Sequence, residues 1–181
     1  EVFTLPLQKE PDSLDICRRH LSIDFDKEKL IRKFEGAYYH APYFKETIHF
    51  LRKIIRYEEN NLFDFIHHSL VETCRYLGIA SRIIVSSNVD INHELKAQER
   101  VLAMCTALGA KDYINPVGGV DLYSREKFHE AGIQLFFIQS RFPDYPQFGA
   151  DFIPSLSIID VMMFNPIETV IKQVNCKYEM I

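Results

Sequence analysis

The chain has 181 residues, of which 47% are hydrophobic, and its formal net charge at pH 7 is −4. That length fits a single domain that can bury a core. A basic surplus and long Lys/Arg tracts are both missing, so we expect no nucleic-acid partner. No apolar run reaches the ~18 residues of a membrane-spanning helix, so we expect no membrane span either.

The cysteine pattern predicts a reducing compartment. The four cysteines are widely spaced among apolar neighbours and form no CxxC pair, which is typical of free buried thiols. The chain shows no signal-peptide pattern, so we expect a cytoplasmic location. These cysteines are Cys17, Cys74, Cys105 and Cys176.

The chain opens without an initiator Met, directly on a strand-like alternation over residues 2–7. We therefore expect that earlier residues of the fold are missing. A turn and a short strand are predicted over residues 14–20.

Three helices are expected over residues 26–78. Asp26 is a good N-cap for the first helix, which ends near Tyr38. Pro42 can occupy the first turn of the second helix. Asn60 or Asn61 begins the third helix, and Gly78 ends it.

Over residues 82–138 the predicted elements alternate in the order strand, helix, strand, helix, strand. Strands are predicted at 82–86, 112–115 and 133–138, and helices at 92–108 and 124–131. The last strand is almost continuously apolar, which is typical of parallel strands covered on both faces. The sequence thus predicts a single α/β domain over residues 1–181. It is a Rossmann-like three-layer parallel sheet with a helical insertion at 26–78, lacking its N-terminal strand and helix.

An aromatic, proline-rich loop over residues 141–153 leads into the last predicted helices. Ser155 is expected to cap a very apolar helix over residues 156–164. Asn165 and Pro166 end that helix and begin a final one.

Ligands of open parallel sheets bind beyond the carboxyl ends of the strands. Here that edge comprises the loops 86–92, 115–123 and 139–153. Ser86 and Ser87 open the first loop, and Tyr123 closes the second. We regard all three residues as ligand-binding candidates.

Lys96, Glu99 and Arg100 form the first group of candidates. A cation near a helix N-terminus opposes the helix dipole, and Lys96 and Arg100 are like charges four residues apart. An anionic ligand would reverse both effects. A solvated face in which Glu99 neutralises its neighbours explains the same pattern.

Gly118 and Gly119 form the second group of candidates. Paired glycines between a strand and a helix can offer backbone amides to a phosphate or carboxylate. A plain turn explains them equally well.

The third group lies on the apolar helix, where Ser157 and Asp160 share one face. A buried carboxylate needs hydrogen bonds or a charged partner, which Arg100 or loop amides can supply. Either a structural network or a catalytic role fits Asp160.

The long loop provides the fourth group, namely Gln139, Tyr145 and Gln147. Tyr145 and Gln147 can hydrogen-bond a ligand, or the loop can simply cover the end of the core. The histidines form no clear metal site, and nucleotide-loop, nucleophile-elbow and zinc-protease motifs are missing. No metal or cofactor is therefore predicted.

Several short segments, in this order and spacing, resemble the WbqC-like protein family. The resemblance covers almost all of the chain. It rests on Phe3-Thr4-Leu5-Pro6-Leu7, Tyr39-His40-Ala41-Pro42-Tyr43-Phe44, Leu77-Gly78-Ile79, Ser86-Ser87, Lys96 with Glu99-Arg100, Ala107-Leu108-Gly109-Ala110, Tyr113, Gly118-Gly119, Tyr123, Ala131-Gly132-Ile133, Tyr145-Pro146-Gln147 and Ser155-Leu156-Ser157-Ile158-Ile159-Asp160.

The resemblance has consequences for fold and function. The family pattern begins with a segment similar to MQPYxxPxxGY, which this chain lacks, in agreement with the expected truncation. Family members are associated with O-antigen and surface-polysaccharide gene clusters in bacteria. Where the pattern places Thr or Ser directly before Glu-Arg, this chain has Ala97-Gln98 after Lys96, so the spacing of that pair is shifted.

The residues and the resemblance lead to two hypotheses for function. In the first, the protein is a transferase for an anionic, nucleotide-linked sugar, with acyl or aminoacyl transfer implied by the resemblance. Lys96, Tyr145 and Asp160 are then the catalytic candidates. In the second, it is a non-catalytic module of a polysaccharide-assembly complex, with the aromatic residues at 38–44 as a protein interface. Packing between two helices explains those aromatics as well. The oligomeric state stays open.

Overall fold

The computed structural model describes all residues except 1, 2, 142 and 150. The protein is a mixed α/β structure with helices and one small sheet of three strands. Among the described residues, no helix combines the length and the apolar character that crossing a membrane requires.

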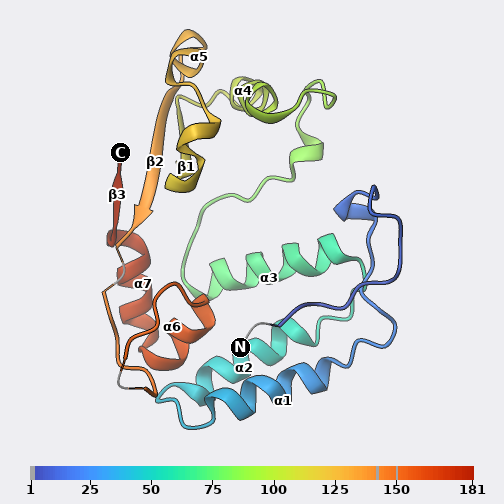
Figure 1. The fold of residues 1–181 in the computed structure, drawn as a ribbon, viewed down its shortest axis with the longest axis vertical. Coiled ribbons are helices and arrows are strands. Elements are labelled where there is room, and N and C mark those ends of the chain that lie inside the picture. Colours follow the sequence, from blue (N-terminus) through green and yellow to red (C-terminus); the bar gives the residue numbers. More distant parts are fainter. Residues whose placement is uncertain (1–2, 142, 150) are drawn as a thin grey trace. The chain divides into compact units, whose positions relative to one another are not determined.

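Contacts divide the chain into two compact units (Figure 1). Unit 1 is helical and comprises Glu1–Ser81 and Asp144–Lys172. Unit 2 holds the sheet and comprises Arg82–Pro143 and Gln173–Ile181.

Helices α1 (Lys27–Tyr38) and α3 (Leu62–Tyr76) of unit 1 begin where the sequence predicts. The side chain of Asp26 accepts a hydrogen bond from the Lys29 amide, and Asn61 caps α3 in the same way. Gly78 follows α3 with a φ of 65°, the left-handed conformation that glycine adopts without strain.

Helix α2 (Phe44–Ile55) starts two residues after Pro42 and not at it. Its apolar face supplies much of the unit 1 core, including Ile48, Leu51 and Ile55. Two hydrogen bonds from α2 and its N-cap tie it to a later helix, α6 (Ile158–Phe164). The buried hydroxyl of Thr47 donates to the carbonyl of Met162 at 3.0 Å, and the Tyr43 amide donates to the carbonyl of Met163 at 3.0 Å.

The predicted N-terminal strands are not formed by the described residues. Residues 3–6 are irregular, and Leu7 makes a single bridge to Leu21. The segment around residue 17 is a short 3-10 helix, η1 (Ile16–Arg18), and His20 bridges to Asn61. Position 2, the predicted start of the first strand, lies outside the described residues.

Helix α6 begins later than predicted. Its N-cap is Ser157, and Ser155 has a φ of 59°, which a helix N-cap does not adopt. Helix α7 (Ile167–Cys176) follows after Pro166, as the sequence predicts.

Unit 2 is built on strands β1 (Asp112–Pro116), β2 (Gln134–Ser140) and β3 (Tyr178–Met180), in the order β1-β2-β3. The first two are parallel, as predicted, and the third is antiparallel to β2. The sequence does not predict β3, because its three residues show no periodicity.

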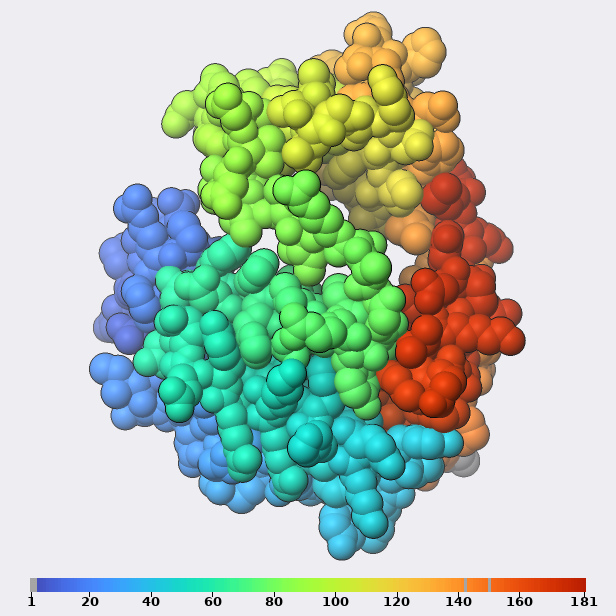
Figure 2. All heavy atoms as spheres, turned by 180° about the vertical axis from the view of Figure 1, so that it is seen from behind, coloured from blue at the N-terminus to red at the C-terminus, as the bar shows by residue number. Residues whose placement is uncertain are grey.

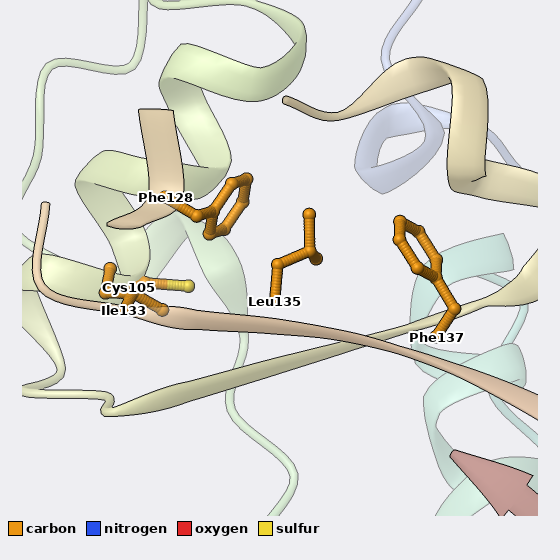
Figure 3. Packing of buried hydrophobic residues seen from close by; sticks show 5 residues of the cluster. All are labelled: Cys105, Phe128, Ile133, Leu135 and Phe137. Atoms are coloured by element: carbon orange, nitrogen blue, oxygen red, sulfur yellow. The ribbon is translucent and has the colours of Figure 1, made fainter. Parts of the chain in front are cut away.

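The core of unit 2 lies on one face of the sheet. Leu135 and Phe137 of β2 point to the same side as Phe128, which is fully buried (Figure 3). Phe128 belongs to helix α5 (Arg125–Glu130), and Cys105, which completes the cluster with Ile133, belongs to helix α4 (Ala97–Ala107).

The prediction of a β2 strand buried on both faces is wrong. Phe136 and Ile138, which point away from this core, are only half-buried. The predicted strand at 82–86 is also wrong: residues 82–85 are irregular and η2 (Ser86–Asn88) is a 3-10 helix. A β-branched run becomes a strand only where another strand pairs with it. The three-layer Rossmann-like arrangement is therefore not confirmed.

Candidate functional site

The strongest polar feature of unit 1 is a buried carboxylate. Asp160 is in the first turn of α6, and only 4% of its surface is exposed. Its Oδ1 accepts a hydrogen bond from the hydroxyl of Tyr38 at 2.9 Å. Its Oδ2 accepts one from the hydroxyl of Tyr145 at 2.7 Å and one from Nε2 of Gln147 at 3.0 Å. We call these four residues the carboxylate cluster.

Each loop donor of the cluster is itself fixed in place. The ring of Tyr145 packs edge-on against Phe152, with centroids 5.1 Å apart. Both ends of the Gln147 amide bind the backbone of Ile153: Nε2 donates to its carbonyl at 3.2 Å and Oε1 accepts from its amide at 2.9 Å. Because the loop is tied to itself in this way, its donors are preorganised around Asp160.

The two phenols act as neutral donors at physiological pH. Burial, followed by the hydrogen bond to Asp160, raises the pKa of Tyr145 to about 12. The same two causes raise the pKa of Tyr38 further. Tyr145 is therefore unsuited to accept a proton, which narrows its predicted catalytic role to orienting Asp160.

The carboxylate retains capacity for one more partner. Within the described part of the chain, Asp160 has no salt-bridge partner, so its negative charge is balanced by dipoles only. A carboxylate oxygen can accept two hydrogen bonds, and Oδ1 accepts a single one, from Tyr38. That oxygen can accept a hydrogen bond from one further N–H or O–H group. Without a ligand, the cluster joins α1, α6 and the loop.

The sequence predicted three members of this cluster and missed the fourth. Tyr38 lies 122 residues from Asp160 in the chain, and no local pattern connects them. We predicted that Arg100 or backbone amides of a loop donate to Asp160. The observed donors are instead two tyrosine hydroxyls and the side-chain amide of Gln147. Ser157, predicted as a ligand-binding residue, is the N-cap of α6: its Oγ accepts a hydrogen bond from the Ile159 amide at 3.2 Å.

The candidates of unit 2 begin at the N-terminus of α4. Lys96 is the N-cap of α4 and not a residue of its first turns, and its side chain makes no capping hydrogen bond. The helix starts late because Asn92, the predicted cap, accepts from the Glu94 amide at 3.0 Å in a separate turn. Arg100 lies one turn into α4, and its buried Nε has no hydrogen-bond partner. Glu99 is exposed between them.

The glycine pair lies on the segment that joins β1 to α5. Ser124, which caps α5, donates its backbone amide to Oε1 of Gln98 at 2.5 Å, so the first turn of α4 contacts the start of α5. Gly119 is within the 3-10 helix η3 (Val117–Leu122). A Cβ on Gly119 would lie 2.5 Å from Oδ1 of Asn115 and 3.4 Å from the ring of Tyr123, whereas a Cβ on Gly118 would meet nothing within 4 Å.

Close packing explains one glycine of the pair. The Asn115 side chain donates to the hydroxyl of Tyr113 at 2.7 Å, and burial raises the pKa of Tyr113 to about 12. Gly119 leaves room for this network, and Gly118 is the one whose surroundings are open. Ser86 and Ser87 are exposed on η2, and Gln139 is half-buried on β2 opposite Glu179.

The fold and these two groups define an α/β protein with a helical unit that buries a carboxylate and a sheet unit in which Nε of Arg100 has no partner among the described residues. Among the described residues, no group of three or more His, Cys, Asp or Glu side chains is placed to hold a metal ion. The model of the WbqC-like protein family matches residues 1–172, and the chain belongs to this family. Searches of curated proteins and of solved structures each returned no significant match.

Proposed function

We propose that this protein is a transferase that acts on an anionic, nucleotide-linked sugar, with acyl or aminoacyl transfer as its reaction. The observation that carries the proposal is the start of α4. There the buried Nε of Arg100 has no hydrogen-bond partner among the described residues, and the exposed cation Lys96 occupies the N-cap position. Membership of the WbqC-like family supports the same class of function.

An anion at the start of α4 would satisfy several groups at once. The first amides of a helix have no partner within the helix, and the helix dipole makes this end positive. Lys96 opposes the dipole at this end, and exposed Glu99 in the first turn offsets part of its charge, so a bound anion would add to an existing balance. A phosphate oxygen bound here would accept from the free amides, from Lys96 and from the guanidinium of Arg100.

The carboxylate cluster of unit 1 enters the proposal as a binding site of its own for the acceptor. An amine or hydroxyl of the acceptor would donate a hydrogen bond to Oδ1 of Asp160, while Tyr38, Tyr145 and Gln147 hold the carboxylate in place.

A thermal-shift experiment with UDP-glucose tests the anion site. At a ligand concentration 100 times its Kd, binding stabilises a protein by about 2.7 kcal/mol, which is a rise in Tm of roughly 5–10 °C for a chain of this size. We expect that Lys96→Ala abolishes the rise without lowering the Tm of the free protein. Lys111→Ala, an exposed lysine of unit 2 outside α4, is the matched control and should keep it. An unchanged rise in Lys96→Ala would refute the anion site.

One observation favours a second candidate function, a non-catalytic module of an assembly complex. The side chain of Tyr39 is 67% exposed at the end of α1, where an aromatic residue can serve a protein interface. Tyr38 is not available for such an interface, because its hydroxyl binds Asp160. A partner complex that survives Lys96→Ala and Asp160→Asn but is lost in Tyr39→Ala, together with no response to UDP-glucose, would establish this alternative.

A further inference from the structure

A groove of about 790 Å³ lies between α2 and α3 of unit 1, and its lining residues are different from those of both groups described above. Its α2 wall includes Lys45, His49 and Lys53, a row of residues four apart, and its α3 wall includes Glu72, Arg75 and Tyr76. These helices form much of the unit 1 surface seen in Figure 2. The volume is in the range of small-molecule sites.

One part of the groove is organised by a buried acid. Glu72 is 7% exposed and pairs with two cations: Nζ of Lys53 lies 2.5 Å from its Oε2, and Arg75 donates to its Oε1. The side chains of Lys53 and Arg75 remain 60% and 68% exposed. Each is therefore anchored by one N–H and keeps others free for an anion. Lys45 lies two helical turns before Lys53 on α2, beside Glu46, so it does not belong to this part of the groove.

The other part is acidic. An adjoining pocket of about 220 Å³ shares Glu46 and Tyr76 with the groove and extends to Glu168 in the first turn of α7. The Tyr76 ring stacks on Phe50, with centroids 4.3 Å apart. Burial raises the pKa of Tyr76, and the charges of Glu46 and Glu168 raise it further, so both carboxylates act on its phenol.

We propose that this groove binds a zwitterionic small molecule, an amino sugar phosphate or a compound of similar charge pattern. Its anionic group would bind Lys53 and Arg75, and its ammonium group would bind Glu46 and Glu168. Two exposed cations at one part of the groove and two carboxylates at the other favour a ligand with both charges over a plain anion or cation. Acidic residues in first turns also stabilise helices without a ligand. The assignment to a ligand rests on the pocket that the two acids share with Tyr76.

The residues of this site differ from those of the proposed anion site at Lys96, so each proposal can fail without the other. Glucosamine 6-phosphate is the probe, and glucose 6-phosphate and glucosamine each carry only one of its two charged groups. Calorimetric titration of the full chain should give the tightest Kd for glucosamine 6-phosphate. Lys96→Ala should leave this Kd unchanged.

Two variants separate the ends of the groove. Glu168→Gln should raise the Kd of glucosamine 6-phosphate about fivefold, because one exposed ion pair with the ammonium group is removed. The Kd of glucose 6-phosphate, which has no ammonium group, should stay unchanged. Arg75→Gln should weaken the binding of both phosphates by a similar factor. Lys53 is left intact in this variant, so that buried Glu72 keeps one cationic partner.

Exposed residues of unit 1 outside the groove provide matched controls, Glu58→Gln and Lys33→Gln. Both variants should bind glucosamine 6-phosphate with the same Kd as the unchanged protein. Equal affinity for glucose 6-phosphate and glucosamine 6-phosphate would refute the proposal that the acidic end binds an ammonium group. The whole inference fails if none of the three probes binds, or if the controls lose as much affinity as Glu168→Gln and Arg75→Gln.

Discussion

Replacing Tyr145 with phenylalanine removes one hydroxyl from the carboxylate cluster and little else. The ring is 9% exposed and keeps its packing against Phe152. The bond lost is the 2.7 Å hydrogen bond to Oδ2 of Asp160, a charge-assisted bond inside the protein. Gln147 is then the one donor left on that oxygen.

The expected cost is set by this geometry. A hydrogen bond to a charged group contributes about 1.5–3 kcal/mol to stability, and its loss leaves a buried acceptor less satisfied. We expect that the free energy of unfolding at pH 7 falls by this amount in Tyr145→Phe. Urea denaturation followed by far-UV circular dichroism measures it. Tyr39→Phe, which removes an exposed hydroxyl, should change stability by less than about 0.5 kcal/mol.

The pH dependence provides a second signature. The pKa of Tyr145 is raised from 10.0 to about 12, so folding favours the neutral phenol. A raised pKa contributes stability that is complete below pH 10 and is lost as the pH rises through 12. Two pKa units correspond to about 2.7 kcal/mol. The stability difference between the two proteins should therefore shrink above pH 10 and largely vanish near pH 12.

Two results would refute this reasoning about Tyr145. The first is a loss at pH 7 no larger than that of Tyr39→Phe, which would mean that the hydroxyl contributes nothing through Asp160. The second is a stability difference that stays constant from pH 8 to 12, which would mean that the phenol does not titrate as its surroundings require.

Further predictions concern unit 2 and the floor of the groove. Gly119→Ala should destabilise the protein by about 1–3 kcal/mol in urea denaturation, because its Cβ would lie 2.5 Å from Oδ1 of Asn115. Gly118→Ala, with nothing within 4 Å, should cost less than about 1 kcal/mol, and equal losses would contradict the packing argument. The hydrogen bond from Lys53 lowers the pKa of Glu72 below its ordinary 4.5. The stability that this ion pair contributes is present above pH 4.5 and is lost as the pH falls through the lowered pKa of Glu72. An acid titration of Tm should show this loss in the unchanged protein and less of it in Glu72→Gln.

Local signals in the sequence predicted the helices well. Asp26, Asn61 and Ser124 cap helices where their side chains can accept from amides two or three residues ahead, and those interactions need no distant partner. The prediction failed at 82–86 and at β3, because a strand exists only through its neighbour. It also failed at Ser155, where the backbone conformation selected Ser157 as the cap instead.

The sequence alone determined features that depend on residue type and short spacing: the starts of α1, α3 and α5, the parallel pair β1 and β2, membership of the WbqC-like family, and a buried Asp160 in need of donors. Only the tertiary structure decided which donors those are. Tyr38 reaches Asp160 across 122 residues, and Lys53 of α2 reaches Glu72 of α3. Such partners are selected by how helices pack, and packing depends on the whole core at once, whereas capping and periodicity depend on a few neighbouring residues.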